Sequence, residues 1–319
     1  MFAVTGCNGF VGHHLCSELK KLELPFRGIQ RDEVKGYFQI KEINASTDWS
    51  NVLKGVEVIF HCAGRAHKLN DKNLDPVSAF REVNVKGTRR LAEQAAKLGV
   101  SKFIFLSSIK VNGEITNRLN SPFDEQSPVQ PSDAYAISKL EAEKALLTVS
   151  RETGLKIVIV RPPLIYGPGV QANFLRLLNV VNKQIPLPFG AIHNQRSLLF
   201  VGNLVDFLIV CAQTSMADNE TFLVSDGPPL STTNLILSLS KSLRKTPNLI
   251  TVRPKILNLL AYLFGRKDDM NRLTSSLIID SSHAISRLNW SPPFSTEYGI
   301  EKTVEWYLEC KSKYISSKS

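Results

Sequence analysis

Two side chains that could exchange a proton lie four positions apart in the stretch SDAYAISKLEAEKAL, residues 132–146. In a helix Tyr135 and Lys139 would lie on the same face, because residues i and i+4 point to the same side. An ammonium beside a phenol favours the phenolate, so we expect Lys139 to lower the pKa of Tyr135 from its ordinary value of about 10. The pair alone is a weak motif, since a surface tyrosine and lysine are often neighbours by chance.

A serine could complete this set. The apolar run FIFLSSIKVNG, residues 103–113, predicts a buried strand whose carboxyl end carries Ser107 and Ser108. In parallel sheets ligands bind beyond the carboxyl ends of the strands. Ser108 could orient a carbonyl or an alcohol there, while Tyr135 gives or takes its proton and Lys139 contacts a ribose.

A glycine-rich turn opens the chain. In VTGCNGFVGHHL, residues 4–15, Gly6, Gly9 and Gly12 lie between a predicted strand and a predicted helix. Such a turn lets backbone N–H groups approach a pyrophosphate at a helix N-terminus, so we favour cofactor binding over a packing turn. After the second predicted strand comes Arg31, whose charge would suit the 2′-phosphate of NADP and so favours NADP over NAD. The alternative is that Arg31 is a solvated charge in a loop.

The elements that must position these residues alternate between strands and helices. Short apolar runs at 2–5, 26–30, 58–62, 103–106 and 156–160 predict strands, and 11–22 and 79–99 have helical spacing, the second ending at Gly99. This alternation predicts an α/β fold of Rossmann type, with a doubly wound parallel sheet. We expect a dinucleotide-binding domain over 1–165 and a smaller, mixed substrate-binding lobe over 166–319, with about 196–225 returning to the first domain.

Two polar residues within apolar patterns are expected to have structural roles and not to bind a ligand. His61 is expected to be a packed histidine, and Asn84 to bond to neighbouring backbone. Ala63 and Gly64 are small enough for the backbone to pass close to a flat cofactor.

Composition is that of a globular protein, with 43% hydrophobic and 21% charged residues. The formal charge of +10 is scattered without a basic run, so we expect no nucleic-acid partner. The five cysteines form no metal-binding or disulfide pattern, which fits the cytoplasm. A strand is predicted from the first residues, so we expect no signal peptide, and the apolar stretch 256–265 is expected to be too short to span a membrane. We expect a helix of the second lobe there, with membrane-surface docking as the alternative.

The motifs TGCNGFVG, HCAG, NVKGT, SSIKVNG, YAISK and RPPLIYGPG, in this order, resemble the extended short-chain dehydrogenase/reductase superfamily, in its NAD-dependent epimerase/dehydratase branch. The resemblance implies a catalytic set of Ser108, Tyr135 and Lys139, with NAD or NADP as cofactor and no metal. It places the pyrophosphate on Gly6, Gly9 and Gly12. Further cofactor contacts are implied for Asn8, Phe10, Arg31, Ala63, Gly64 and Pro162, as well as for Tyr135 and Lys139.

The same resemblance implies a nucleotide-sugar substrate, contacted by Ser108, Asn173 and Arg196. The planar guanidinium of Arg196 suits phosphate oxygens. The family often forms homodimers through the helices that follow the fourth and fifth strands. The chain has LNW at 288–290 where the family often has LGW, a departure that we expect to affect a cap and not the chemistry.

Three reactions share this catalytic set: C4 epimerisation, C4 ketoreduction or its reverse, and 4,6-dehydration. Dehydratases of the family carry an Asp–Glu pair directly after the catalytic hydroxyl residue, and here Ile109 and Lys110 stand instead. The combination of FHCAGRAH with SSIKVNGE resembles bacterial reductases of UDP-4-keto-6-deoxy-N-acetylhexosamines, so we favour 4-ketoreduction in surface-polysaccharide sugar synthesis. The alternative is a UDP-hexose 4-epimerase with bound NAD.

Two other classes fit less well. A 3β-hydroxysteroid dehydrogenase-like activity does not explain Asn173 and Arg196, which suit a phosphate-bearing substrate. Relatives that bind a dinucleotide without catalysis typically lose the tyrosine or the lysine, and both are present here.

Overall fold

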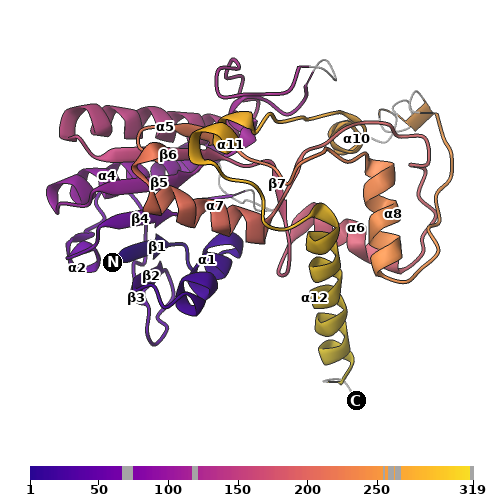
Figure 1. Cartoon of the computed structure of the whole chain (residues 1–319), viewed down its shortest axis with the longest axis horizontal. Helices are drawn as coiled ribbons and strands as arrows, with labels where there is room; N and C mark the ends of the chain where they lie inside the picture. The colour runs from indigo at the N-terminus through magenta and orange to yellow at the C-terminus, as the bar shows by residue number, and fades with distance from the viewer. Residues whose placement is uncertain (67–74, 117–120, 254–255, 258–261, 263–266, 317–319) are drawn as a thin grey trace.

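The computed structural model describes residues 1–66, 75–116, 121–253, 256–257, 262 and 267–316. Its central feature is a parallel sheet in the order β3-β2-β1-β4-β5-β6-β9 (Figure 1). Every pair of neighbours is parallel. The strand order reverses between β1 and β4, which creates a switch point at their carboxyl ends. The predicted fold class is confirmed. The strands are β1 (Phe2–Thr5), β2 (Phe26–Gln30), β3 (Phe38–Gln39), β4 (Val58–His61), β5 (Lys102–Leu106), β6 (Lys156–Arg161) and β9 (Thr221–Leu223).

Helices cover both faces of this sheet because successive strand residues point to opposite sides. Val4, Phe60 and Ile104 pack in one core cluster with α1 (Phe10–Lys21) and α7 (Val201–Gln213). Their neighbours Ala3 and Ile59 pack in the other, with α4 (Thr88–Lys97), α5 (Ala134–Thr153) and the short α2 (Ser50–Leu53). The near-continuous apolar strands are thus explained by burial on both faces.

The helix expected to end at Gly99 is interrupted. It runs as α3 (Pro76–Arg81), a π-helical segment Glu82–Gly87 and α4. A β-carbon on Gly87 would lie 2.5 Å from the Ile43 side chain, so the chain passes close here. Gly99 follows α4 with φ of +79°, the left-handed conformation expected just past a helix end.

A second core lies beside the sheet. It surrounds β7 (Leu164–Tyr166) and β8 (Leu198–Phe200), a parallel pair, and includes Tyr166, Phe174 and Phe200. In Figure 1 its helices gather on the side away from α2. These helices are α6 (Ala172–Asn182), α8 (Thr232–Ser242), α10 (Lys267–Thr274) and α12 (Thr296–Ser316).

The chain returns to the large sheet after β8. Both α7 and β9 fall within the region 196–225, and β9 is the last strand of the sheet. A later segment returns as well: Ala284 of α11 (Ser282–Leu288) and Trp290 pack in the cluster of α1 and α7. The domain boundary near residue 165 stays a prediction.

The apolar stretch 256–265 lies mostly outside the described residues. Of its described members, Leu257 is buried in the second core, while Ile256 and Tyr262 are exposed. Within the described ranges, no helix combines the length and the apolar character that crossing a membrane requires.

The packing of the segment after α11 against the large sheet can be tested at Trp290. Its ring lies 4.9 Å from that of Phe207, and its indole Nε1 donates to Asp206 at 2.7 Å. Removing a buried aromatic side chain leaves a cavity, so Trp290→Ala should lower the free energy of unfolding by about 3–5 kcal/mol in urea denaturation. Leu308→Ala, on an exposed face of α12, should change it by less than about 0.5 kcal/mol. Equal effects would contradict this packing.

Candidate active site

The glycine-rich turn joins β1 to α1 by close backbone contact. Gly6 has φ of +71° and its N–H bonds to the Ile29 carbonyl at 3.0 Å. A β-carbon on Gly12 would lie only 2.2 Å from the Gly6 carbonyl oxygen, and one on Gly6 would lie 2.8 Å from Ala63 Cα. Gly9 begins α1 without a side-chain cap. The N–H groups of the first turn of α1 are therefore free of a competing side chain, which suits a bound pyrophosphate.

The residues around this turn differ in exposure. Asn8 is exposed, whereas Phe10 is half-buried and its ring lies against His14, 5.6 Å between ring centres. His14 Nε2 lies 2.7 Å from the Pro168 carbonyl oxygen, and a β-carbon on Gly169 would lie 3.7 Å from the Phe10 ring. The loop after β7 thus rests on the first turn of α1.

Gln30, the last residue of β2, is buried. It accepts from Cys7 Sγ at 3.6 Å and donates to the Asp32 carbonyl at 3.1 Å. Arg31 is exposed, and its carbonyl accepts from Gln39 at 3.0 Å. It follows the carboxyl end of β2, and its role in cofactor choice stays a prediction.

His61 is a packed residue, as predicted. Its Nδ1 lies 2.7 Å from Thr5 Oγ1 and its Nε2 lies 2.9 Å from Thr88 Oγ1. Burial lowers the pKa of His61 to about 3, helped by the Lys139 ammonium, so the ring is neutral. The ring therefore links β4 to β1 and α4 by hydrogen bonds, and it adds no charge to the site.

Asn84 holds the turn after β4, which confirms the expected bond to backbone. Its Oδ1 accepts from the Arg65 N–H at 2.7 Å, and its Nδ2 donates to the Arg65 carbonyl at 3.1 Å and to Ser138 Oγ at 2.9 Å. A β-carbon on Gly64 would lie 3.3 Å from Asn84 Oδ1 and 3.4 Å from Lys139 Nζ. The backbone at Gly64 therefore passes directly beside the lysine.

Tyr135 and Lys139 lie one turn apart near the start of α5, which is capped by Asp133. Lys139 Nζ donates to the Leu106 carbonyl at 2.8 Å, at the carboxyl end of β5. The same nitrogen lies 4.5 Å from the centre of the Phe105 ring and 6.0 Å from that of the Tyr135 ring. The lysine thus bridges α5 and β5 with the tyrosine beside it.

The expected lowering of the tyrosine pKa is wrong for the protein chain by itself. Burial raises the pKa of Tyr135 to about 12, and Asp133 adds to the effect. Burial also lowers the pKa of Lys139 to about 8, against the opposing effects of Cys62 and Glu143. Loss of water disfavours both the phenolate and the ammonium, and here it outweighs their mutual attraction.

Ser108 follows β5 and begins a 3₁₀ turn, Ile109–Val111, with its Oγ accepting from the Lys110 N–H at 3.3 Å. The Ile109 N–H bonds to the Pro162 carbonyl at 3.0 Å, so the ends of β5 and β6 lie together. Lys110 Nζ pairs with Asp133 at 2.7 Å. Ser108 and Pro162 therefore lie at the edge that the start of α5 reaches.

The two predicted substrate residues lie in the second lobe. Asn173 is exposed in the first turn of α6. The backbone of Arg196 pairs with that of Leu230, and its guanidinium donates to the Ser275 carbonyl at 3.1 Å. Their contact with a substrate stays a prediction.

A buried ion pair beneath the site was not expected from the sequence. Glu143 of α5 and Arg161 of β6 are only 2% and 7% exposed, and they form a two-pronged pair. Signals for both were present: Glu143 lies on the stripe of Tyr135 and Lys139, and Arg161 ends an otherwise apolar strand.

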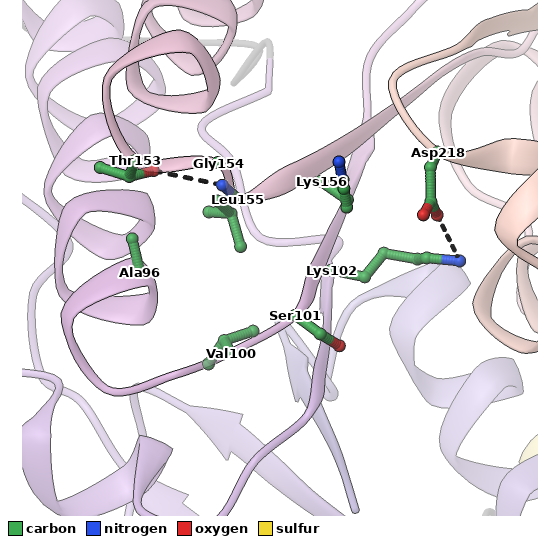
Figure 2. Close-up of a pocket in the computed structure, with 9 residues that line it drawn as sticks. All are labelled: Ala96, Val100, Ser101, Lys102, Thr153, Gly154, Leu155, Lys156 and Asp218. Atoms are coloured by element: carbon green, nitrogen blue, oxygen red, sulfur yellow. Dashed lines mark hydrogen bonds and ion pairs between the residues drawn. The ribbon is translucent and has the colours of Figure 1, made fainter.

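Two cavities can be described on the surface of the described residues. Figure 2 shows one of about 410 Å³ at the amino ends of β5 and β6, where Lys102 pairs with Asp218 at 2.8 Å. It is at the opposite end of the strands from the glycine turn. The other, of about 630 Å³, is lined by residues within 112–116 and 121–132.

Comparisons with known proteins agree with this architecture. Residues 2–225 match the model of the NAD dependent epimerase/dehydratase family. A UDP-glucose 4-epimerase of Vibrio cholerae is 41% identical over 97% of this chain and 96% of its own length.

Solved structures share the fold. A UDP-glucuronic acid 4-epimerase of Bacillus cereus in complex with NAD has a TM-score of 0.77 at 20% identity, covering 97% of this chain and 99% of its own. A UDP-glucose 4-epimerase of Thermotoga maritima with UDP-glucose has a TM-score of 0.74 at 22% identity, with the same coverage. The expected nicotinamide dinucleotide cofactor is confirmed for the family, with NAD as the form that its description names. This chain is an enzyme of the NAD dependent epimerase/dehydratase family.

Proposed function

We propose that this enzyme is an NAD-dependent 4-epimerase of UDP-hexoses, with UDP-glucose and UDP-galactose as the first pair to test. The observation that carries the proposal is the 41% identity to the Vibrio cholerae UDP-glucose 4-epimerase. The match extends over nearly all of both chains, so it includes the substrate lobe as well as the cofactor domain. It supports 4-epimerisation better than the 4-ketoreduction that local motifs favoured.

The residues after Ser108 argue against 4,6-dehydration. That reaction needs carboxylates to remove a second proton and expel a hydroxyl. Ile109 is apolar and buried, and Lys110 is a cation already paired with Glu114 and Asp133. The chemistry proposed here is therefore confined to C4.

The glycine turn fits the pyrophosphate of NAD, because the Gly6–Gly12 contact leaves no room for side chains over the first turn of α1. Ala63 and Gly64 would allow the flat parts of the cofactor to approach the backbone, and Lys139 would contact the nicotinamide ribose. When bound, NAD supplies a reversible acceptor for the C4 hydride and a positive charge near the phenol.

The side chains of this protein would handle the proton. Tyr135 would take it from the C4 hydroxyl as the carbonyl forms and return it when the alcohol is restored. Ser108 would hold the same oxygen by a hydrogen bond. Since the pKa of Tyr135 is about 12 in the chain alone, the Lys139 ammonium and the cofactor charge together would have to stabilise the phenolate.

Incubation with UDP-glucose tests the reaction itself. We expect UDP-galactose to form without net oxidation or reduction of added nicotinamide cofactor, as followed by NMR of the sugars. In parallel, UDP-4-keto-6-deoxy-GlcNAc with NADH or NADPH should give no stoichiometric loss of reduced-nicotinamide absorbance. Such a loss, without interconversion of the hexoses, would identify a 4-ketoreductase and refute the proposal.

Tyr135→Phe tests the proton carrier. Because the variant lacks the phenolic hydroxyl, turnover should fall by about 10²- to 10⁴-fold, with NAD binding by calorimetry almost unchanged. Tyr298→Phe is a control, since Tyr298 is exposed on α12, and it should retain activity. An active Tyr135→Phe enzyme would remove this tyrosine from the mechanism.

Gly12→Ala tests the pyrophosphate site. The added methyl group would meet the Gly6 carbonyl at 2.2 Å, so the turn must open and NAD affinity should fall at least about tenfold. Ser17→Ala, on an exposed face of the same helix, should leave NAD affinity unchanged. Equal affinity in the two variants would show that the cofactor does not use this turn.

A further inference from the structure

One buried carboxylate connects the two elements that carry the proposed catalytic set, α5 and the turn after β5, with the end of β6. Arg161 Nε donates to Glu143 Oε1 at 3.0 Å and Arg161 Nη2 donates to Glu143 Oε2 at 2.6 Å. Both side chains are less than a tenth exposed. A two-pronged pair of this kind fixes the direction as well as the distance of its partners.

The pair also reaches the ends of β5 and β6. Ser107 Oγ donates to Glu143 Oε1, and Arg161 Nη1 donates to Asn112 Oδ1 at 3.1 Å. Asn112 Nδ2 in turn donates to the Ser127 carbonyl at 3.2 Å. The network therefore joins α5, the turn after β5, the end of β6 and the segment that leads back to α5.

Three members of this network lie beside residues predicted for the site: Ser107 and Glu143 beside the proposed catalytic set, and Arg161 beside a predicted cofactor contact. Ser107 directly precedes Ser108, and Arg161 directly precedes Pro162. Glu143 lies one turn after Lys139, which lies one turn after Tyr135, so the three share a helix face. A shift of this pair would therefore move the serine, the tyrosine and the lysine relative to one another.

We propose that Glu143 and Arg161 are positioning residues for catalysis, holding Ser108 against Tyr135 and Lys139. The proposal rests on the proposed function for its kinetic part. The alternative is a purely structural ion pair, whose loss matters only because a buried charge is left without its partner.

The pKa of Lys139 also depends on the Glu143–Arg161 pair, because Glu143 favours the charged form of the lysine. The titratable groups that face its ammonium are Tyr135 and Glu143 on α5, and His61 and Cys62 on and after β4. His61 is neutral, and burial raises the pKa of the Cys62 thiol to about 12. The Glu143 carboxylate, which is paired with Arg161, favours the charged form of Lys139, so its removal should lower the pKa of Lys139 further below its ordinary value.

The first test compares Glu143→Gln with Glu141→Gln. Glu141 lies on the same helix but pairs with Arg81 at the surface, so its variant controls for charge and helix composition. At a temperature where both are fully folded, Glu143→Gln should lose about 10²-fold in kcat, with KM and NAD affinity within about twofold of the unaltered enzyme. The alkaline limb of its kcat–pH profile should move to lower pH. Glu141→Gln should change none of these, and an unaltered kcat in Glu143→Gln would overturn the proposal.

The second test separates positioning from stability. Glu143→Leu/Arg161→Met replaces both charges by apolar groups, which commonly restores the stability that a single removal costs. We expect its denaturation midpoint to exceed that of Glu143→Gln while kcat stays low. Recovery of kcat together with stability would show a structural role only and overturn the proposal.

A third test needs no substrate. In enzyme with ¹³C-labelled lysine, NMR should show Lys139 titrating near pH 8, with the signal assigned by its absence from Lys139→Arg. The titration midpoint of Lys139 should fall in Glu143→Gln and stay unchanged in Glu141→Gln. This result does not depend on the stability of the double variant. An unshifted midpoint would contradict the proposed coupling. Failure of the unaltered enzyme to interconvert UDP-hexoses would refute only the proposed function, because this titration would still report on the pair.

Discussion

The arrangement of the site depends on the burial of one ammonium group. The Lys139 ammonium is buried, donates to the Leu106 carbonyl and lies over the face of the Phe105 ring. An unpaired charge in such a place is costly, and it is tolerated because a carbonyl dipole, an aromatic face and a nearby carboxylate replace water. Since these partners come from different elements, the lysine can be satisfied only when α5 and β5 are docked in one register. Its placement therefore constrains the carboxyl edge of the sheet.

The same loss of water decides the electrostatics of the site. It raises the pKa of Tyr135 and lowers that of Lys139, so each group is closer to its neutral form than in solution. A neutral phenol is a poor base, whereas a lysine titrating near neutral pH responds strongly to nearby charge. The chain by itself is thus arranged so that charges brought by ligands would have a large effect on proton transfer.

The connection between the two cores follows from close contacts around β7 and the loop that follows it. The His14 ring meets the Pro168 carbonyl, and the Tyr166 hydroxyl donates to Asp226 at 2.8 Å. Gly299 allows α12 to approach, because a β-carbon there would lie 2.6 Å from the Tyr166 hydroxyl oxygen. The loop after β7 is therefore held between the first turn of α1 and the second core, which fixes the second core beside the sheet.

Much of this protein was determined by local sequence pattern. The apolar runs at the positions of β1, β2, β4, β5 and β6, and the helical spacing of 11–22 and 79–99, predicted the sheet and its class because burial on two faces demands them. The glycine turn and the pair of Tyr135 and Lys139 were visible for the same reason, since short-range spacing fixes which residues share a turn or a helix face. The packed role of His61 and the backbone bonds of Asn84 also followed from polar residues standing in apolar patterns.

Only the tertiary structure decided the features that depend on distant contacts. The two-residue strand β3 has no periodic signal, and the helical spacing of 79–99 did not reveal the π-helical turn around Asn84. The return of Trp290 to the first core joins segments far apart in the chain. The pairing of Glu143 with Arg161 requires the docking of α5 on β6. The pKa of Tyr135 was mispredicted, and the lowered pKa of Lys139 was not foreseen, because spacing reports the attraction between two charges, while the cost of removing their water depends on everything packed around them.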